Sequence, residues 1–295
     1  MTEITAPLVR QLIAEQFPQW AALPVTPVAV GGWDNRTFHL GDDLSVRLPS
    51  APRYAVQAEK EHRWLPLLGP QLPLPIPQSL ALGQPSAAFP WPWSVRRWLD
   101  GEQASVQTIR DSVAFAHALA DFLNALQRID THGGPAAGEH NFYRGTPPVV
   151  YDDQTRQTIR ALQQEGRLDA LSALRVWDAA LDSVWQGPPV WIHGDVAPGN
   201  LLVREGRLSA VIDFGGCAVG DPACDLVIAW TLLRGEGRRA FRAALPLDEA
   251  TWARARGWAL WKALITAADP ADAVKASEAR RVLLEVLSDP LTAPR

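Results

Sequence analysis

Two acids and an amide stand where a short β-hairpin would bring them together. Asp195 lies in a loop, Asn200 ends that loop, and Asp213 follows the apolar run of residues 208–212. A second apolar run covers residues 201–203, and the Glu-Gly pair between the runs is suited to a tight turn. Pairing of the two runs predicts that Asn200 and Asp213 lie at the same end of the hairpin, with Asp195 beside them.

This arrangement of oxygen atoms predicts a particular chemistry. Carboxylate and amide oxygens suit Mg²⁺, a hard cation that takes a few protein oxygens and shares its remaining positions with phosphates. Asn200 and Asp213 are therefore the predicted magnesium ligands, and Asp195 is left free to accept a proton. A metal site beside an acid of this kind is typical of phosphoryl transfer.

The same residues resemble a known family. His-Gly-Asp at 193–195 with Asn200 five residues after the aspartate, and Asp213 beyond them, is similar to the catalytic and metal-binding loops of the aminoglycoside phosphotransferase and choline kinase family, relatives of protein kinases. The resemblance covers about residues 28–230. It implies that Asp195 is the catalytic base and that Asn200 and Asp213 hold Mg²⁺. Many relatives carry histidine where this chain has Ala197.

The resemblance implies an α+β, two-lobed, protein-kinase-like fold. A small β-rich N-lobe, residues 1–100, is expected to combine an antiparallel sheet with a helix and to bind the nucleotide. A larger, mainly helical C-lobe, residues 101–295, is expected to carry the catalytic loop and the acceptor site. The backbone of Arg97, Trp98 and Leu99 is expected to form the hinge that pairs with the adenine edge.

A glycine pair at the start of the N-lobe is a candidate phosphate site. Gly31 and Gly32 precede two alternating runs, 36–40 and 44–48, that predict a hairpin. Glycine lets the backbone approach a ligand closely and offer N–H groups to phosphate oxygens. The position before two expected strands favours phosphate binding, and an ordinary turn is the alternative.

Arg47 stands on the second of these runs, where family members carry a phosphate-binding lysine. Arginine can neutralise phosphate through its planar fork, although its geometry differs from that of lysine; a solvent-facing arginine is the alternative. Glu61 falls on the apolar stripe of a helix predicted over 54–68, whereas Glu59 faces Arg63. An inward carboxylate needs a cationic partner, so Glu61 is predicted to pair with Arg47.

The remaining pattern sets out the other elements. A polar loop over 135–150 either borders the acceptor site or is a connector. Two cysteines, Cys217 and Cys224, are interpreted as reduced core residues. The tryptophans of the C-terminal part are interpreted as core residues. The alternative for one or two of them is that they line the acceptor groove. Helices are predicted over 7–17, 105–129, 152–164, 169–185 and from 225 onward, and further strands over 78–82 and 93–98.

Three residues near the catalytic segment are interpreted as structural. His193 is expected to hold its loop through the ring nitrogens, since the family template already supplies a base. Asp221 and Asp225 match a further family block and are expected to cap and anchor loops, because aspartate before proline commonly opens a helix.

Composition narrows the class of partner. A net charge of −4 over 295 residues gives no electrostatic case for nucleic acid. No apolar stretch is long enough to span a membrane, and the N-terminus lacks a signal-peptide pattern, so a cytoplasmic protein is expected. The sequence does not indicate an oligomeric state.

The combined prediction is a kinase that moves the γ-phosphate of ATP or GTP to a hydroxyl of a small molecule. An aminoglycoside antibiotic is the leading acceptor, which would make the protein an antibiotic-resistance enzyme. A macrolide, a choline-like alcohol, an amino alcohol or a sugar is the alternative. Two further hypotheses are a catalytically weak nucleotide-binding pseudokinase, motivated by Arg47, and a metal-dependent hydrolase that uses the same acids.

Overall fold

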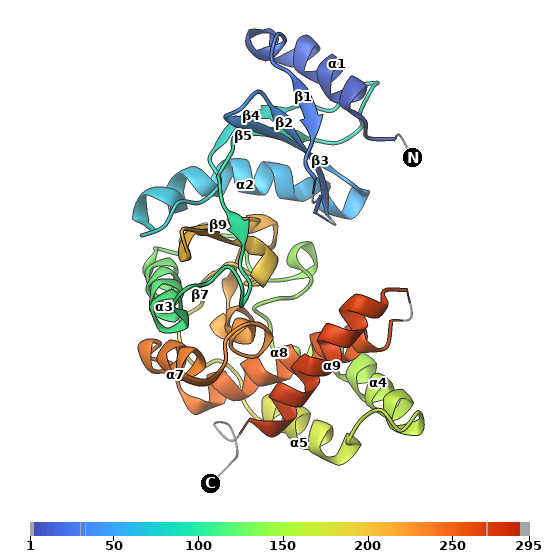
Figure 1. Cartoon of the computed structure of the whole chain (residues 1–295), viewed down its shortest axis with the longest axis vertical. Helices are drawn as coiled ribbons and strands as arrows, with labels where there is room; N and C mark the ends of the chain where they lie inside the picture. The colour runs from blue at the N-terminus through green and yellow to red at the C-terminus, as the bar shows by residue number, and fades with distance from the viewer. Residues whose placement is uncertain (1–2, 30, 33, 270, 290–295) are drawn as a thin grey trace.

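The computed structural model describes residues 3–29, 31–32, 34–269 and 271–289. It has a β-sheet N-terminal region above a mainly helical C-terminal region (Figure 1). The predicted α+β, two-part, kinase-like fold is confirmed. A division of the chain into domains at residue 100 stays a prediction.

The N-terminal region is built on a five-stranded antiparallel sheet. The predicted hairpin is confirmed, with Leu40 opposite Leu44 at its turn. In spatial order the strands are β1 (Val25–Pro27), β2 (Asn35–Leu40), β3 (Leu44–Pro49), β5 (Trp93–Arg97) and β4 (Ser79–Gly83). Helix α1 (Ala6–Gln16) buries Val9, Leu12 and Ile13 in one apolar cluster with the sheet.

Helix α2 (Ala55–Leu68) links this sheet to the rest of the molecule. It contacts β4 and β5 and also the segment just after Asp213. Trp64, Leu65 and Leu68 belong to the large apolar cluster of the C-terminal region rather than to the sheet's own cluster. The position of α2 is therefore set by both regions.

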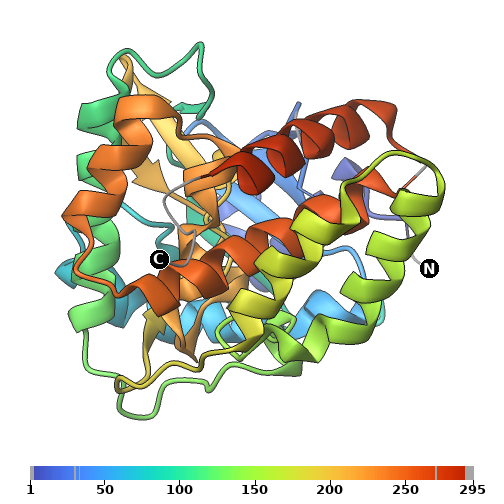
Figure 2. The same ribbon diagram turned by 90° about the horizontal axis from the view of Figure 1, so that it is seen from below.

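The C-terminal region surrounds the predicted catalytic hairpin with helices. Strands β8 (Leu201–Arg204) and β9 (Arg207–Val211) form that hairpin, and both turn residues between them have positive φ. Strand β6 (Glu102–Gln103) joins β8, and β7 (Val190–Ile192) pairs with β10 (Ala218–Gly220). Seen from below (Figure 2), the helices lie around and beneath these strands: α3 (Ser112–Arg128), α4 (Asp152–Gln164), α5 (Ala170–Leu181), α6 (Ile228–Thr231), α7 (Gly235–Ala244), α8 (Glu249–Ala267) and α9 (Ala273–Ser288).

Two predicted helices have different ends from those expected. The helix predicted over 105–129 begins at Ser112, because the Asp111 carboxylate accepts hydrogen bonds from the N–H groups of Val113 and Ala114 and so starts the helix there. Residues 105–108 form a separate turn in which the Thr108 hydroxyl accepts from the Ser105 N–H at 2.9 Å. The helix predicted over 169–185 ends at Leu181.

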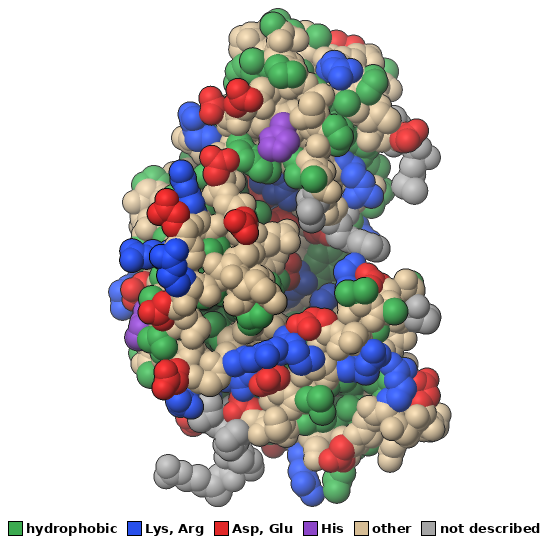
Figure 3. Space-filling view, viewed as in Figure 1, with side chains coloured by type: hydrophobic (Ala, Val, Ile, Leu, Met, Phe, Trp, Pro, Cys, Tyr) green, Lys and Arg blue, Asp and Glu red, His purple; other side chains and the backbone are tan. Residues whose placement is uncertain are grey.

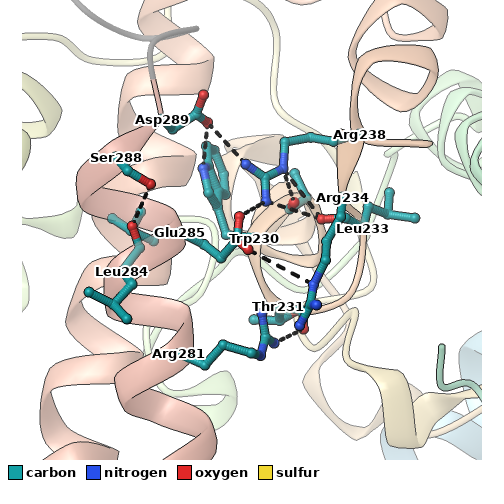
Figure 4. Close-up of polar contacts among 12 residues, drawn as sticks. Trp230, Thr231, Leu233, Arg234, Arg238, Arg281, Leu284, Glu285, Ser288 and Asp289 are labelled. Carbon is teal, nitrogen blue, oxygen red and sulfur yellow. Dashed lines mark hydrogen bonds and ion pairs between the residues drawn. The ribbon is translucent and has the colours of Figure 1, made fainter. Parts of the chain in front are cut away.

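The last helix is held by polar contacts with α6 and α7 (Figure 4). Arg238 on α7 donates to the carboxylate of Glu285 at 2.5 Å, and the Trp230 indole donates to Asp289 at 2.6 Å. Arg281 donates to the Thr231 carbonyl at 2.6 Å. These contacts keep α9 against the helical region, where the chain from 225 onward is largely helical as predicted. No helix of the described chain is long and apolar enough to cross a membrane.

Candidate active site

The loop that carries Asp195 is anchored from beneath by a buried acid. Asp225, 1% exposed, accepts hydrogen bonds from the N–H groups of His193 and Gly194, both at 2.7 Å. Burial raises the pKa of Asp225, while the hydrogen bonds from the two N–H groups oppose that shift. The expectation that Asp225 is a loop anchor is confirmed by these contacts.

Gly194 has to be a glycine at this point of the loop. Its φ is +82°, and a Cβ there would lie 2.3 Å from the Gly216 carbonyl oxygen. The backbones of the loops that carry Asp195 and Asp213 therefore lie in direct contact at Gly194 and Gly216. Their close approach brings the two acids to one site.

His193 is a positioning residue, as predicted. Its Nδ1 accepts from the Asp195 N–H at 3.1 Å, so the proton is on Nε2, which donates to the Ile212 carbonyl at 2.9 Å. The ring is fully buried and therefore cannot reach a substrate. It ties the Asp195 loop to the residue that precedes Asp213.

The hairpin brings the three predicted residues together. The Ile212 N–H donates to the Asn200 carbonyl at 2.9 Å, which places Asn200 next to the start of the Asp213 loop. The Asn200 amide donates to the Asp195 carboxylate at 3.1 Å and to the Asp195 carbonyl at 2.9 Å. The Asp195 side chain is 43% exposed, and Figure 3 shows the molecule hollowed between its two regions, with charged side chains inside the hollow.

Asp213 faces the cation of β3. Arg47 donates to Asp213 Oδ1 at 2.9 Å across 166 residues of sequence. Burial would raise the pKa of Asp213, but the charge and hydrogen bond of Arg47, with a smaller contribution from Arg96, together outweigh burial and lower that pKa, so the carboxylate is ionised. Asp213 has a φ of +66°, an uncommon conformation for a residue with a side chain and one that often marks a functional position.

Glu61 points inward as predicted, but its main partner was missed. Arg96 on β5 binds both carboxylate oxygens, at 2.9 and 2.5 Å, and is itself 2% exposed. Arg47 is 3.6 Å from Glu61, within ion-pair range but beyond a good hydrogen bond. The predicted Arg47–Glu61 pair is thus the weaker half of a three-member network. An arginine within an apolar strand, facing the same side as Ser94, was the available signal.

A third acid of this site was also missed. Asp34 accepts a hydrogen bond from Gln57 on α2 at 3.1 Å. Burial raises the pKa of Asp34, and the nearby charges of Asp213 and Asp195 raise it further. Asp34 follows the glycine pair, and Gly31 and Gly32 are both exposed, with no heavy atom nearer than 3.7 Å to a Cβ built on either. The glycines leave room for a ligand, and their role in phosphate binding remains a proposal.

The predicted hinge is partly occupied by internal hydrogen bonds. The Arg97 N–H donates to the Gln78 carbonyl at 3.0 Å, and the Trp98 N–H donates to the Asp43 carbonyl at 2.7 Å. These two N–H groups are therefore not free to donate to a base in this conformation. Pairing with adenine would need carbonyl groups of the segment or the N–H of Leu99.

A buried lysine joins α2 to the loop over 135–150. Lys60 donates to His140 Nδ1 at 3.1 Å, and His140 Nε2 lies 2.9 Å from the Ala136 carbonyl. An ammonium can only donate, so His140 accepts at Nδ1, carries its proton on Nε2 and is neutral. Burial lowers the pKa of His140, the Lys60 charge lowers it further, and burial lowers the pKa of Lys60.

Because the pKa of His140 is lowered in the folded protein, the free energy of unfolding should decrease at acidic pH. The unfolded chain has a normal histidine pKa and binds more protons than the folded chain as the pH falls through about 6.5. We expect the free energy of unfolding of the wild type to decrease from pH 7.5 to 5.5 by more than that of His140→Gln, whose amide can make both hydrogen bonds without titrating. Denaturant unfolding at several pH values measures this; parallel curves for the two proteins would contradict it.

The loop over 135–150 lies beside Asp195. Arg144 places Nη2 3.3 Å from Asp195 Oδ1, a contact that the sequence interpretation did not foresee. The loop therefore lies beside the predicted base, and its place at the acceptor site stays a prediction. Cys217 and Cys224 are buried as expected, and burial raises the pKa of Cys217 to about 12, so it is not a reactive thiol.

The oxygen donors at the hairpin end fit Mg²⁺. Since Asn200 uses its amide nitrogen for Asp195, the amide oxygen is the atom left for a cation. Asp213 is ionised and faces the same cleft. Among the described residues no group of three or more His, Cys, Asp or Glu side chains could form a metal centre. Two protein oxygens are nevertheless sufficient for Mg²⁺ that shares its other positions with phosphates.

A β-sheet region over a helical region, with this set of acids, amide and arginine at the junction, defines a phosphotransferase of protein-kinase-like architecture. The profile described as the phosphotransferase enzyme family (APH) matches residues 25–258, and the chain belongs to this family. The protein is a small-molecule kinase. A comparison with curated proteins finds no significant match.

Solved structures share the fold over nearly the whole chain. The GDP complex of wild-type aminoglycoside 2'-phosphotransferase IIIa is 21% identical with a TM-score of 0.70, over 96% of this chain and 99% of that one. The streptomycin–ATP ternary complex of APH(2")-IIa is 18% identical with a TM-score of 0.61, over 97% of both chains. A macrolide 2'-phosphotransferase from Brachybacterium faecium is 22% identical with a TM-score of 0.58, over 93% of this chain and 97% of that one.

Proposed function

We propose that this enzyme transfers the γ-phosphate of ATP or GTP to a hydroxyl group of a small molecule, with Asp195 as the base. The observation that carries the proposal is the convergence of Asp195, Asn200 and Asp213 at one end of the hairpin, with Arg47 reaching across from the other region. The nucleotides in the structures of the GDP and ATP complexes that share this fold support a nucleoside triphosphate donor.

In the proposed reaction Asp195 accepts a hydrogen bond from the acceptor hydroxyl and directs its oxygen toward the γ-phosphorus. The transition state of phosphoryl transfer is loose, so correct placement contributes more than strong basicity. His193 and Asp225 hold the loop, and Asn200 holds the carboxylate from one side. Arg47 would neutralise phosphate charge from β3, where relatives use lysine.

Asn200 and Asp213 would hold Mg²⁺. The chemistry that the bound ion supplies is neutralisation of charge on the phosphate oxygens. Gly31, Gly32 and the hinge segment complete the proposed nucleotide site, while Glu61 keeps the two arginines in place through its contacts with Arg96 and Arg47.

The acceptor is the finer part of the proposal. An aminoglycoside is expected first from the sequence resemblance, and relatives with this fold include both aminoglycoside and macrolide enzymes. Choline-like alcohols, amino alcohols and sugars complete the set to be tried. An antibiotic-resistance role depends on the acceptor, and the expected cytoplasmic location is likewise a prediction.

The test is an assay of purified protein with Mg²⁺, ATP or GTP, and an alcohol panel, in which nucleoside diphosphate and phosphorylated product are both measured. Product that forms only with an acceptor present supports the proposal. Phosphate release independent of any acceptor would instead indicate a hydrolase. Nucleotide binding with no turnover of any acceptor in the panel would indicate a pseudokinase.

Replacement of Arg47 tests the nucleotide side. We expect Arg47→Ala to weaken nucleotide binding roughly 10- to 100-fold, the range for loss of a charge-assisted hydrogen bond. Arg47→Lys, which restores the cation of the relatives, should retain most of the affinity. Titration calorimetry with a non-hydrolysable nucleotide measures both variants, with the exposed Arg160→Ala on α4 as the matched control. An unchanged KM for ATP in Arg47→Ala would refute the role of Arg47 in nucleotide binding.

A further inference from the structure

Arg144 carries a charge for which the proposed reaction has no use. Its guanidinium meets Asp195 Oδ1 at 3.3 Å, while the Asn200 amide binds Oδ2 of the same carboxylate at 3.1 Å. One oxygen is thus turned toward the proposed magnesium site and the other toward Arg144. An acceptor hydroxyl that binds Asp195 away from the metal comes in beside Arg144.

The backbone before Arg144 is held in an unusual conformation. Phe142 and Tyr143 have φ values of +57° and +56°, in the left-handed region that residues with side chains rarely adopt, and here two occur in succession. Hydrogen bonds keep them there: the Tyr151 hydroxyl donates to the Phe142 carbonyl at 3.0 Å, and the Tyr143 N–H donates to the Gly138 carbonyl at 2.7 Å. Strain maintained in this way is often found at functional sites.

Asn141 ties this turn to the metal loop. It is fully buried, and its amide donates to the carbonyl of Arg144 at 2.7 Å and to the carbonyl of Gly216 at 3.2 Å. Gly216 lies three residues after Asp213. The backbone of Arg144 is therefore fixed relative to the loop that follows Asp213. The Arg144 side chain is 19% exposed.

Helix α8 packs beside the Arg144 loop, since Trp261 stacks on Tyr151 with ring centroids 4.1 Å apart. The Asp195 carboxylate is already balanced by a cation of the protein, because Arg144 lies 3.3 Å from it.

We propose that the acceptor is an alcohol with an anionic group, such as a carboxylate, close to the hydroxyl that is phosphorylated, and that Arg144 binds this group. The proposal rests on the proposed function. When the hydroxyl takes Asp195 Oδ1, Arg144 needs a new anionic partner, and a carboxylate matches its planar fork. An ammonium group at the same place would meet the like charge of Arg144, so polycationic aminoglycosides are expected to be poorer acceptors than acidic alcohols.

The experiment uses sets of probes that share one skeleton and differ in charge. One set is a uronic acid, its parent sugar and the amino sugar; a second is a hydroxy acid, its methyl ester and the corresponding amino alcohol. Binding is measured by thermal shift with a non-hydrolysable nucleotide, and turnover by acceptor-dependent release of nucleoside diphosphate. Wild type is compared with Arg144→Gln, Arg144→Lys and the exposed control Arg160→Gln.

We expect the anionic member of at least one set to be preferred, and the ratio of its kcat/KM to that of the cationic member to fall roughly 10- to 100-fold in Arg144→Gln. Arg144→Lys should retain part of the preference and Arg160→Gln all of it. A ratio is used because a general effect of the substitution on Asp195 cancels in it. Preference for the cationic members, a flat series, or a preference unchanged in Arg144→Gln would overturn the inference.

The same measurements distinguish failure of the anion site from failure of the proposed kinase reaction. If no set is phosphorylated but the anionic probes stabilise wild type more than Arg144→Gln, the anion site stands and the kinase reaction fails. If a cationic acceptor is phosphorylated efficiently in an Asp195-dependent manner, the kinase stands and the anion site is wrong.

Discussion

Asp195→Ala is expected to lower kcat by several orders of magnitude, roughly 10³- to 10⁴-fold, and to leave nucleotide binding nearly intact. The side chain makes its contacts with Asn200 and Arg144 in the cleft, whereas the His193 ring binds the backbone N–H of Asp195, which alanine keeps. The loop should therefore retain its shape, and the loss should fall on the orientation of the acceptor hydroxyl.

The measurement for Asp195→Ala pairs steady-state turnover with nucleotide binding by calorimetry. Asp121→Ala, a change of the same kind on the exposed side of α3, is the matched control and should behave as wild type. Turnover within tenfold of wild type would remove Asp195 from the role of base. A large loss of nucleotide affinity would show instead that the substitution disturbs the site as a whole.

Arg254→Met is expected to reduce the free energy of unfolding by about 3–5 kcal/mol, the usual cost of removing one partner of a buried ion pair. Arg254, 1% exposed on α8, donates to Asp221 at 2.6 Å and also to the hydroxyl groups of Ser183 and Thr251, each at 3.0 Å. Without it, Asp221 is left buried at 5% exposure with a charge that no longer has this partner.

The effect of Arg254→Met should extend to activity at elevated temperature. Asp221 caps the segment Pro222–Val227, and that segment contains Asp225, which holds the loop that carries Asp195. Denaturant unfolding measures the stability, with the exposed Arg160→Met as control. The double variant Asp221→Asn/Arg254→Met should recover part of the loss because the buried charge is gone. A single variant as stable as wild type would contradict the importance of this pair.

Several features of the site could be predicted because they depend on residues close together in sequence. The convergence of Asn200 and Asp213 follows from a hairpin of about a dozen residues whose apolar runs and turn are visible in the chain. The inward direction of Glu61 follows from helical periodicity, and it is 1% exposed. The capping role of Asp221 follows from the proline after it.

The ends of predicted helices were less accurate, and the reason is local competition. Apolar periodicity continues upstream of Ser112, but side-chain hydrogen bonds of Ser105, Thr108 and Asp111 give the backbone an alternative to the helix. Periodicity records which face a segment would bury and does not record which of two hydrogen-bonded conformations is more stable.

The partners of the charged groups were decided by tertiary structure alone. Glu61 could have paired with Arg47 or Arg96, both on neighbouring strands and both directed toward α2, and only the packing of α2 determines that Arg96 makes the bidentate contact. In the same way the Arg47–Asp213 bond spans the two regions, and no local pattern sets the distance between them.

Arg144 shows most clearly which features the sequence predicts and which depend on tertiary packing. The sequence by itself predicted a phosphotransferase loop, the three residues expected to carry its chemistry and a two-part fold, because each is encoded in short-range patterns of side chains and turns. It placed Arg144 in a loop expected either to border the acceptor site or to serve as a connector, and it gave the Arg144 side chain no role. Its contact with Asp195 depends on two left-handed residues and a buried asparagine whose hydrogen bonds exist only once the distant Gly216 loop has packed beside them. Long-range packing, which decides what surrounds the acceptor, therefore lies beyond what the linear pattern records.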